Sequence, residues 1–340
     1  MRIGFNPNKN QENFESDYFH QVVIPVYIPH QEGYFKDSFE ILKVCLQSLF
    51  KTIHDKTFIT IVSNGSSVEI NNYLNDLFLQ GIIHEIIITN NIGKTNAVLK
   101  GIVGHDFPII TVSDADVLFL SNWQSSTYDV FECFPKTGVV CPTPSSRSLR
   151  TYTANFYWDV LFSKNLKFSK VKNSEALKMF ALSVGNAKFY NEAQLRKYLT
   201  ISNENCQAVV GAGHFVATYR GDIFDTITTK YSKFKLGGDS LGKVLDIPVV
   251  KNGFWRLSTH DNYAYHMGNV LEDWMQVEIN TLQKNDFSGL VILSKKSLNS
   301  NLSYFIKSRL FSKFILNKKI MPYFFIYKGL SKSEAKEYLT

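Results

Sequence analysis

Short apolar runs alternate with amphipathic segments through the first half of the sequence, and this alternation restricts the possible folds more than any other feature. The run 21–29 (QVVIPVYIP) ends in proline and is typical of a buried parallel strand. An alternating strand and helix order predicts an α/β fold, in which helices cover both faces of a mostly parallel sheet. Further strands are expected at 58–67, 83–89, 107–120 and 137–142, and helices at 37–54, 66–79 and 95–103.

Two of the expected helices carry a start signal. Asp37 with Glu40, and Ser66 with Glu69, have the spacing of a capping box, in which two side chains satisfy the first free backbone N–H groups of a helix. These pairs therefore predict helix starts close to residues 37 and 66.

Polar residues follow the expected strands at the points where each strand ends. In parallel sheets, ligands bind beyond the carboxyl ends of the strands. The clusters are Tyr27, Ser63–Gly65, Asn90–Asn91 and Ser113–Asp116, which come from four separate loops. We therefore expect a ligand site at this edge of the sheet.

The last of these clusters contains the sequence Asp114-Ala115-Asp116 directly after an apolar strand. Carboxylate oxygens suit Mg²⁺ or Mn²⁺, which often bind one or two carboxylates together with substrate phosphates. The D-x-D pattern alone is also common in solvated loops. Its position at the end of a central strand favours a metal site.

The Gly93-Lys94-Thr95 sequence raises the question of a phosphate-binding loop of the ATPase type. That loop requires a second glycine five residues before Gly93, and Ile88 occupies the position. A β-branched residue does not take the positive-φ conformations that glycine supplies. The ATPase interpretation therefore fails.

Four segments in order, VVIPVY, IVSNGSS, NNIGKTNAVLKG and ITVSDADVLF, resemble the nucleotide-binding half of GT-A glycosyltransferases, most closely family 2. The resemblance covers about 20–145 well and 206–270 more loosely. It implies a Rossmann-like sheet with an acceptor-side second half. It also implies transfer of a hexosyl or N-acetylhexosaminyl group from a nucleotide sugar to a glycan or lipid-linked glycan, with inversion, in surface polysaccharide synthesis.

The resemblance also implies roles for single residues near the nucleotide. Asn64 would lie near the base or ribose, although the acidic residue usual in this turn is replaced here by Ser63 or Asn64. The divalent ion, Mn²⁺ or Mg²⁺, would be held by Asp114 and Asp116. The residues expected to bind the nucleotide sugar are Pro25, Tyr27, Asn64, Asn91, Lys94, Asp114 and Ala115.

The segment GGDSLGKVL resembles the acidic helix start that carries the catalytic base in the family, with Gly238 in place of the first acid. Asp239 is the expected base, and a helix N-cap is the alternative role for it. Asp222 and Asp225 are weaker candidates for the base.

On the acceptor side, the resemblance implies that Gly211 and Gly213 allow close approach of a sugar, with His214 beside them. His266 is a candidate third metal ligand, and His260 and Asp261 could replace it in that role. A purely structural histidine is the simpler interpretation of His266.

The predicted organisation is an extension (1–20), a nucleotide-sugar-binding half (21–145), an acceptor-binding half (146–290) and a basic aromatic segment (291–340). Within it, 151–205 is expected to be an insertion over the site. The basic residues between 304 and 328 are Lys307, Arg309, Lys313, Lys318, Lys319 and Lys328, with no acidic residue among them. This stretch suits either an anionic membrane surface or a packed helix. Nucleic acid is not an expected partner.

The chain shows no signal peptide and no apolar stretch of about 18 residues, and its four cysteines form no C-x-x-C pair. These features predict a cytoplasmic protein, peripheral to the membrane at most. Two further functions stay open. One is an inactive nucleotide- or glycan-binding module. The second is a sugar nucleotidyltransferase, although the expected G-x-G-x-R loop after the first strand is missing.

Overall fold

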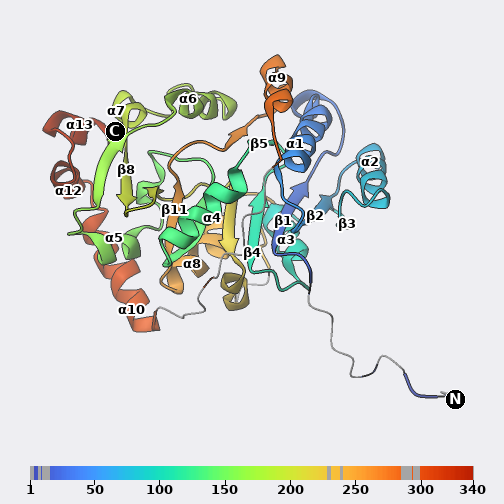
Figure 1. Ribbon diagram of the computed structural model, residues 1–340, viewed down its shortest axis with the longest axis horizontal. Helices are drawn as coiled ribbons and strands as arrows, with labels where there is room; N and C mark the ends of the chain where they lie inside the picture. Colours follow the sequence, from blue (N-terminus) through green and yellow to red (C-terminus); the bar gives the residue numbers. More distant parts are fainter. Residues whose placement is uncertain are drawn as a thin grey trace.

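The computed structural model describes residues 4–6, 9, 16–227, 231–237, 240–284, 293 and 299–339. Within them a ten-stranded sheet has the order β3-β2-β1-β4-β10-β6-β11-β9-β8-β7, and β5 pairs with β12 in a second, small sheet (Figure 1). The strands are β1 (His20–Val26), β2 (Thr57–Asn64), β3 (Glu85–Thr89), β4 (Ile109–Ser113), β5 (Val117–Phe119), β6 (Thr137–Cys141), β7 (Leu166–Lys170), β8 (Lys197–Ser202), β9 (Gln207–Val210), β10 (Val216–Arg220), β11 (Trp255–Thr259) and β12 (Ala264–His266).

The two halves of the large sheet differ in strand direction. Strands β3, β2, β1 and β4 are all parallel, as the sequence predicts for this part of the chain. Strand β10 then runs antiparallel between β4 and β6, β11 is parallel to β6, and β9, β8 and β7 are antiparallel. The α/β fold class is confirmed, with the parallel strands concentrated in the first half.

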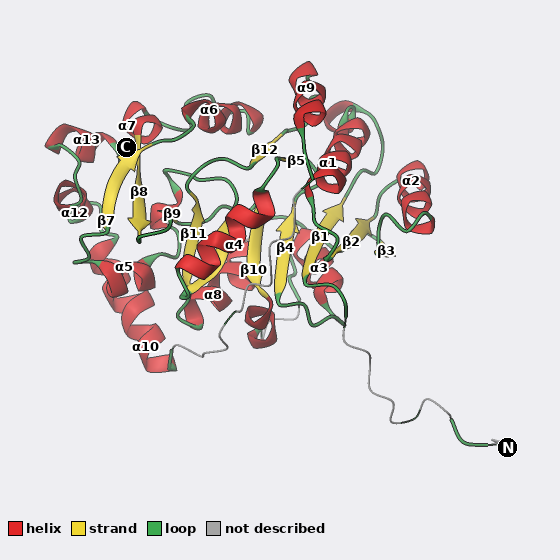
Figure 2. Cartoon of the chain, viewed as in Figure 1, coloured by secondary structure: helices red, strands yellow, loops and turns green. Residues whose placement is uncertain are grey.

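Helices lie on both faces of the sheet (Figure 2). The apolar residues of α1 and α4 pack on one face, and those of α3 and α8 pack on the other. The helices are α1 (Ser38–Thr52), α2 (Val68–Leu79), α3 (Lys94–Ile102), α4 (Trp123–Cys133), α5 (Ala154–Val160), α6 (Ser174–Ser183), α7 (Glu192–Arg196), α8 (Ile247–Lys251), α9 (Asp273–Thr281), α10 (Asn301–Phe305), α11 (Ser312–Ile315), α12 (Met321–Tyr327) and α13 (Lys332–Glu337).

The continuous apolar run at residues 22–26 of β1 follows from this double covering. Successive side chains of a strand point to opposite faces. Val22 and Ile24 pack with α1, whereas Val23 packs with α3 on the other face. Helix α3 approaches closely at Gly101, where a Cβ atom would lie only 2.7 Å from Val23 Cγ1. A strand buried on both faces therefore appears in the sequence as a continuous apolar run.

The expected strand 107–120 is wrong in one respect. Residues 114–116 leave the sheet as a turn, so the run is divided into β4 and β5. Strand β5 then pairs antiparallel with β12 in the small sheet and does not continue β4. In the sequence, the apolar residues after the turn resemble a continuation of β4. In the structure they are buried against α1 rather than within the large sheet.

Both expected capping boxes are also wrong. Asp37 precedes α1 without a side-chain cap, and its Oδ2 accepts a hydrogen bond from the Leu271 N–H at 3.2 Å. Ser66 lies outside α2, and its hydroxyl donates to the Val26 carbonyl at 3.1 Å. Both side chains bond to segments distant in sequence, which a local spacing pattern does not detect.

Residues 151–205, expected to be an insertion over the site, contribute strands to the large sheet. Strands β7 and β8 lie in this segment and extend the large sheet, which therefore continues across the boundary expected near residue 145. In β7, Leu166 and Phe168 are buried while Lys167 is exposed, which is the alternation of a strand with one solvated face. The four-part domain division stays a prediction.

The C-terminal helices pack on residues 151–205. The Phe325 ring packs against Phe168 of β7, and Phe311 packs edge-to-face against Trp158 of α5. Among the described residues, no helix combines the length and the apolar character that crossing a bilayer requires.

Candidate active site

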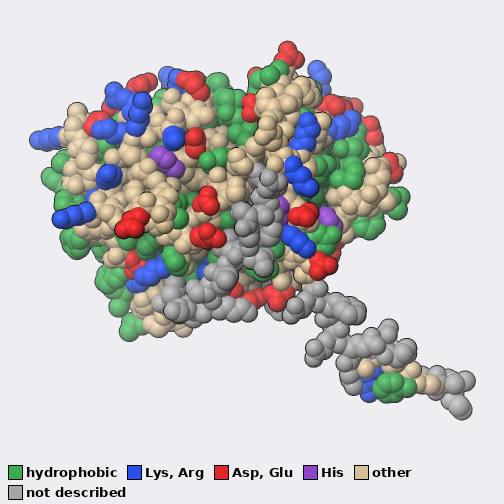
Figure 3. Space-filling model, in the orientation of Figure 1, with side chains coloured by type: hydrophobic (Ala, Val, Ile, Leu, Met, Phe, Trp, Pro, Cys, Tyr) green, Lys and Arg blue, Asp and Glu red, His purple; other side chains and the backbone are tan. Residues whose placement is uncertain are grey.

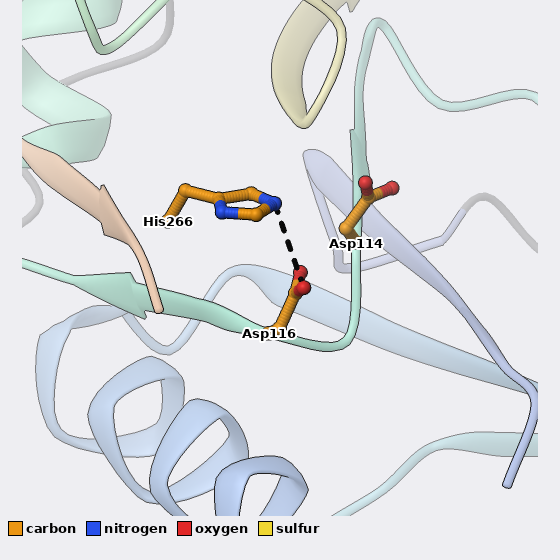
Figure 4. Close-up of side chains that lie close together, drawn as sticks. All are labelled: Asp114, Asp116 and His266. Atoms are coloured by element: carbon orange, nitrogen blue, oxygen red, sulfur yellow. Dashed lines mark ion pairs between the residues drawn. The ribbon is translucent and has the colours of Figure 1, made fainter. Parts of the chain in front are cut away.

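The residues of the expected ligand site lie together at the carboxyl edge of the parallel strands. Strand β4 ends at Ser113, and the turn that follows carries Asp114 and Asp116. The pairing of β5 with β12 places His266 opposite Val117, directly beside this turn. Segments far apart in the sequence thus supply one cluster of ligating groups (Figure 4).

The three side chains Asp114, Asp116 and His266 each offer a ligand atom, and these atoms lie within 4.8 Å of one another. His266 Nε2 lies 3.5 Å from Asp116 Oδ2. Burial raises the pKa of Asp116 to about 6, although His266 and Lys94 act in the opposite direction. The cost of burying this carboxylate therefore exceeds the stabilisation that the two neighbouring groups supply.

These groups fit a divalent cation. Asp116 Oδ1 is buried and has no hydrogen-bond partner among the described residues. A buried carboxylate oxygen without a partner is costly unless an ion or water satisfies it. Two carboxylates and one imidazole suit Mn²⁺ well and Mg²⁺ less well, because Mg²⁺ prefers oxygen ligands alone.

Lys94 forms an ion pair with Asp114. It is the first residue of α3, where a positive charge opposes the helix dipole. The pair with Asp114 offsets this cost and holds the ammonium group at the acidic turn. Both side chains are partly exposed, so a ligand in the cleft can reach them.

A cavity of about 410 Å³ opens beside α1, and we call it the α1 cavity. Tyr27 and Phe35 stand edge-to-face on its wall, with ring centroids 5.7 Å apart. The residues that line it include every one predicted to bind the nucleotide sugar, namely Pro25, Tyr27, Asn64, Asn91, Lys94, Asp114 and Ala115.

Two of these lining residues also hold the loops in place. Asn64 Oδ1 accepts a hydrogen bond from the Ile92 N–H at 2.9 Å, and Asn91 Oδ1 accepts one from the Gly93 N–H at 3.1 Å. The oxygen of each amide therefore accepts one hydrogen bond within the protein. The Asn64 amide group can still offer a ligand its N–H donors and the second lone pair of its oxygen.

A second cavity of about 550 Å³ opens beside α6, and we call it the α6 cavity. It shares Lys94 and Asp114 with the α1 cavity, so the two meet at the acidic turn. Its far wall is aromatic, with Phe180 stacked on Phe215 at a centroid distance of 5.4 Å. Gly213, His214 and His266, which the sequence assigns to the acceptor side or the metal, line this cavity.

The His214 imidazole lies next to a buried carboxylate, that of Asp246. Its Nε2 lies 3.1 Å from Oδ2 of Asp246, which is fully buried. Asp246 Oδ1 in turn lies 2.8 Å from Nη2 of Arg256, which is also fully buried. This buried pair orients the His214 ring at the cavity wall. The sequence does not mark Asp246 or Arg256 as site residues, because each comes from a different element.

Several sequence expectations receive a different explanation. Gly211 has φ of +98°, and a Cβ atom there would lie 2.3 Å from the Ser148 carbonyl oxygen. Chain packing, rather than approach of a sugar, thus requires that glycine. Asp222 forms an ion pair with Arg220 outside both cavities. Asp239, the expected base, lies outside the described residues, so its role stays a prediction.

The weaker base candidate Asp225 and the substitute metal ligands His260 and Asp261 lie outside the cluster of ligand atoms. They line neither cavity, and the Asp261 carboxylate accepts from the Asn262 N–H at 2.8 Å. Residues that the sequence did not single out are Tyr34, Phe35, Lys235 and Leu236 in the α1 cavity and Arg147 in the α6 cavity. Of these, only Tyr34 and Phe35 carry a signal in the sequence, because they are two adjacent aromatic residues in the loop after the first strand.

No family model and no curated protein sequence matches this chain. A fragment of S. aureus TarS in complex with UDP-GlcNAc is similar in structure, with a TM-score of 0.43 and 11% identity, over 94% of this chain and 70% of that one. A mannosyltransferase, PcManGT from Pyrobaculum calidifontis in complex with GDP-Man and Mn²⁺, has a TM-score of 0.43 and 12% identity, over 93% and 73%. Values this low assign neither family nor activity, so the interpretation of the site depends on its own residues.

Proposed function

We propose that this chain is a divalent-metal-dependent glycosyltransferase of the GT-A type. It would take a hexosyl or N-acetylhexosaminyl group from a nucleoside diphosphate sugar in the α1 cavity. It would pass that group to a hydroxyl of a glycan or lipid-linked glycan in the α6 cavity, in the synthesis of a surface polysaccharide. The observation that carries the proposal is the junction of the two cavities at Lys94 and Asp114, beside Asp116 and His266.

On the donor side, the aromatic wall suits a nucleotide base. Tyr27 and Tyr34 are exposed at the α1 cavity and present ring surface on which a base can stack. The diphosphate would then reach Lys94 and the acidic turn. Asp114, Asp116 and His266 would hold Mn²⁺ or Mg²⁺, which would supply positive charge that stabilises the departing diphosphate.

In the transfer step, the acceptor hydroxyl attacks the anomeric carbon from the side opposite the diphosphate, so the configuration inverts. The bond to the diphosphate breaks as the new glycosidic bond forms, and the hydroxyl proton passes to a base. Asp239 is the proposed base. Lys94 would donate hydrogen bonds to the leaving diphosphate, in competition with its present partner Asp114.

The first test is ligand binding measured by thermal unfolding. Nucleoside diphosphates are added with and without Mn²⁺ to the wild type, to Asp116→Ala and to Asp106→Ala, an exposed acidic residue outside the site. A ligand at 100 times its Kd adds about 2.7 kcal/mol to the free energy of unfolding. We expect a Mn²⁺-dependent rise in Tm for the wild type and Asp106→Ala only. Absence of any rise with every diphosphate contradicts the donor site.

An inactive binding module is the second candidate, because cavities and ligating groups serve binding as well as catalysis. Turnover separates the two. Incubation with the nucleotide sugar whose diphosphate binds should release that diphosphate, faster when an acceptor glycan is present. Binding without release in either condition favours the module.

We also propose that the C-terminal helices hold the protein at an anionic membrane surface. Two of the six basic residues have roles within the protein. Lys307 pairs with Asp159 at 3.3 Å, and buried Lys328 donates to the Ser163 carbonyl at 2.9 Å. The remaining four are exposed. On the face drawn in Figure 3, apolar, basic and acidic side chains are mixed in the lower left part of the view, where α10 lies. We define the basic helical face as Leu302, Phe305, Arg309, Leu310, Lys313 and Phe314, all exposed.

This face has the mixture that an interfacial helix requires, with apolar side chains for the acyl boundary and cations for anionic headgroups. Binding to vesicles with and without anionic lipid tests it. We expect the double variant Arg309→Glu/Lys313→Glu to lose binding to anionic vesicles. The control is Lys178→Glu, at an exposed position of α6, which should bind as the wild type does. Equal binding by all three proteins contradicts the proposal.

A further inference from the structure

Ser183, the last residue of α6, lies behind the candidate metal ligand His266. Its hydroxyl oxygen is 2.9 Å from His266 Nδ1. The Nδ1 atom of the imidazole therefore contacts α6, and the Nε2 atom is directed toward Asp116 (Figure 4). Which nitrogen carries the proton decides whether the ring can bind a cation through Nε2.

The proton positions follow from the partners of Ser183. The Ser183 hydroxyl lies 2.8 Å from the Phe180 carbonyl oxygen, and a carbonyl only accepts hydrogen bonds. The hydroxyl proton is therefore donated to Phe180. The hydroxyl oxygen then accepts from His266, so Nδ1 carries the imidazole proton. In a neutral imidazole with Nδ1–H, Nε2 carries the free lone pair.

The surroundings hold the ring in this orientation. The rings of Phe180 and Phe215 stand edge-to-face against the imidazole, at centroid distances of 5.9 and 5.3 Å. The C-terminal end of α6 also packs closely against the segment after β12. Gly268 has φ of +74°, and a Cβ atom there would lie 2.9 Å from the Ser183 carbonyl oxygen. The contact between α6 and His266 is thus part of a packed arrangement.

We propose that Ser183 is a positioning residue that fixes His266 in the Nδ1–H tautomer and so prepares Nε2 to bind a divalent cation. This inference rests on the metal site of the proposed function. It makes α6 a shared element, because Ala176, Leu177 and Phe180 of the same helix line the α6 cavity. The helix that contacts the acceptor would therefore also support the metal.

The test measures Mn²⁺ affinity by electron paramagnetic resonance, in the absence of any sugar nucleotide. Loss of a group that orients a metal ligand commonly weakens metal binding by about 10- to 100-fold. We expect that loss for Ser183→Ala. Ser183→Thr keeps a hydroxyl and should bind close to the wild-type value. Ser125→Ala is the matched control, because its hydroxyl donates to the Asn122 carbonyl at 3.1 Å in an exposed turn at the start of α4.

The tautomer gives a second readout that a general loss of packing would not move. Long-range ¹H–¹⁵N spectra of the metal-free protein should show His266 as Nδ1–H in the wild type and as a mixture in Ser183→Ala. Wild-type Mn²⁺ affinity or an unchanged tautomer in Ser183→Ala overturns the role of Ser183. Undiminished Mn²⁺ binding by Asp116→Ala instead overturns the metal site itself, so the two failures are distinguishable.

Discussion

Lys94 and Asp114 are the two residues that both cavities share, and their ion pair is the most direct link between them. We expect Lys94→Met to weaken nucleoside diphosphate binding about 10- to 100-fold, because a hydrogen bond to a charged group contributes about 1.5–3 kcal/mol. Calorimetric titration measures the change. Lys100→Met, exposed on the same helix, is the control and should bind normally. Equal affinity in both variants would remove Lys94 from the site.

A second group of residues, beneath α4, is buried and polar but distant from the cavities. His54 Nδ1 accepts from the Lys56 N–H at 3.1 Å, and its Nε2 lies 2.8 Å from the Tyr128 hydroxyl. That hydroxyl lies 2.6 Å from His20 Nδ1, and His20 Nε2 lies 2.6 Å from Thr111 Oγ1. Each of these hydrogen bonds has one donor and one acceptor when the imidazole rings of His20 and His54 are both neutral. Burial lowers the pKa of His54 to about 4 and places that of His20 well below its usual range.

These shifts predict loss of stability in acid. The unfolded chain binds protons on these rings below about pH 6.5, whereas the folded chain does not until about pH 4 for His54. The free energy of unfolding should therefore keep its highest value above pH 6.5 and decrease as the pH is lowered toward 4. His54 alone accounts for up to about 3 kcal/mol of that fall.

Urea unfolding between pH 4 and pH 7 measures the effect. His54→Gln should flatten the dependence, while His30→Gln, at an exposed position, should leave it as in the wild type. A wild-type stability that does not change over this range would show that the network tolerates protonation.

At the residue scale, the sequence indicates the residues that line the α1 cavity better than those that line the α6 cavity. Tyr27 and Lys94 come after β1 and β3, and Asn64 is the last residue of β2, so strand order alone brings them together at one sheet edge. Ser183 and Asp246 act through contacts with His266 and His214, which lie far away in the sequence. No local spacing encodes such contacts, and the side chains themselves are common types.

Among the elements, α5 connects the C-terminal helices to the sheet through Asp159. Its carboxylate accepts from the Trp255 Nε1–H at 2.9 Å and forms ion pairs with Lys136 and Lys307. We expect Asp159→Ala to lower the free energy of unfolding by about 1–3 kcal/mol, because the indole N–H and Lys307 lose their acceptor in a largely buried position. Chemical denaturation measures it, with exposed Asp76→Ala as the control. Equal stability of both variants would assign the docking to apolar packing alone.

The elements of the parallel half were predictable because each buried strand is a continuous apolar run. The antiparallel strands β7 and β8 were not, since half of their residues are polar and the flanking segments have helical composition. The carboxylates mark the turn at 114–116 in the sequence, but nothing local indicates that β5 leaves the large sheet there. The pairing partner of β5 lies in β12, beyond residue 260, and an apolar run does not indicate its partner.

For the whole molecule, the proposed function predicts that donor binding and acceptor binding can be blocked separately, because the two cavities adjoin but have different walls. Val184 lines the α6 cavity at an exposed position, and Ser38 lines the α1 cavity. We expect Val184→Trp to abolish transfer but keep nucleoside diphosphate affinity, and Ser38→Phe to lose that affinity. Titration and transfer assays on both variants check this. Loss of diphosphate binding in Val184→Trp would mean that the cavities act as one.

The pairing of β5 with β12 has a consequence for the order of events during synthesis. Asp114 and Asp116 leave the ribosome early, but His266 joins them only after the whole acceptor-side part of the sheet has been made. Contacts so distant in sequence form late in folding, because the intervening chain must first be ordered. A nascent chain that ends before β12 would carry both carboxylates without the imidazole. Full-affinity Mn²⁺ binding at the proposed site would therefore require a chain made at least as far as β12.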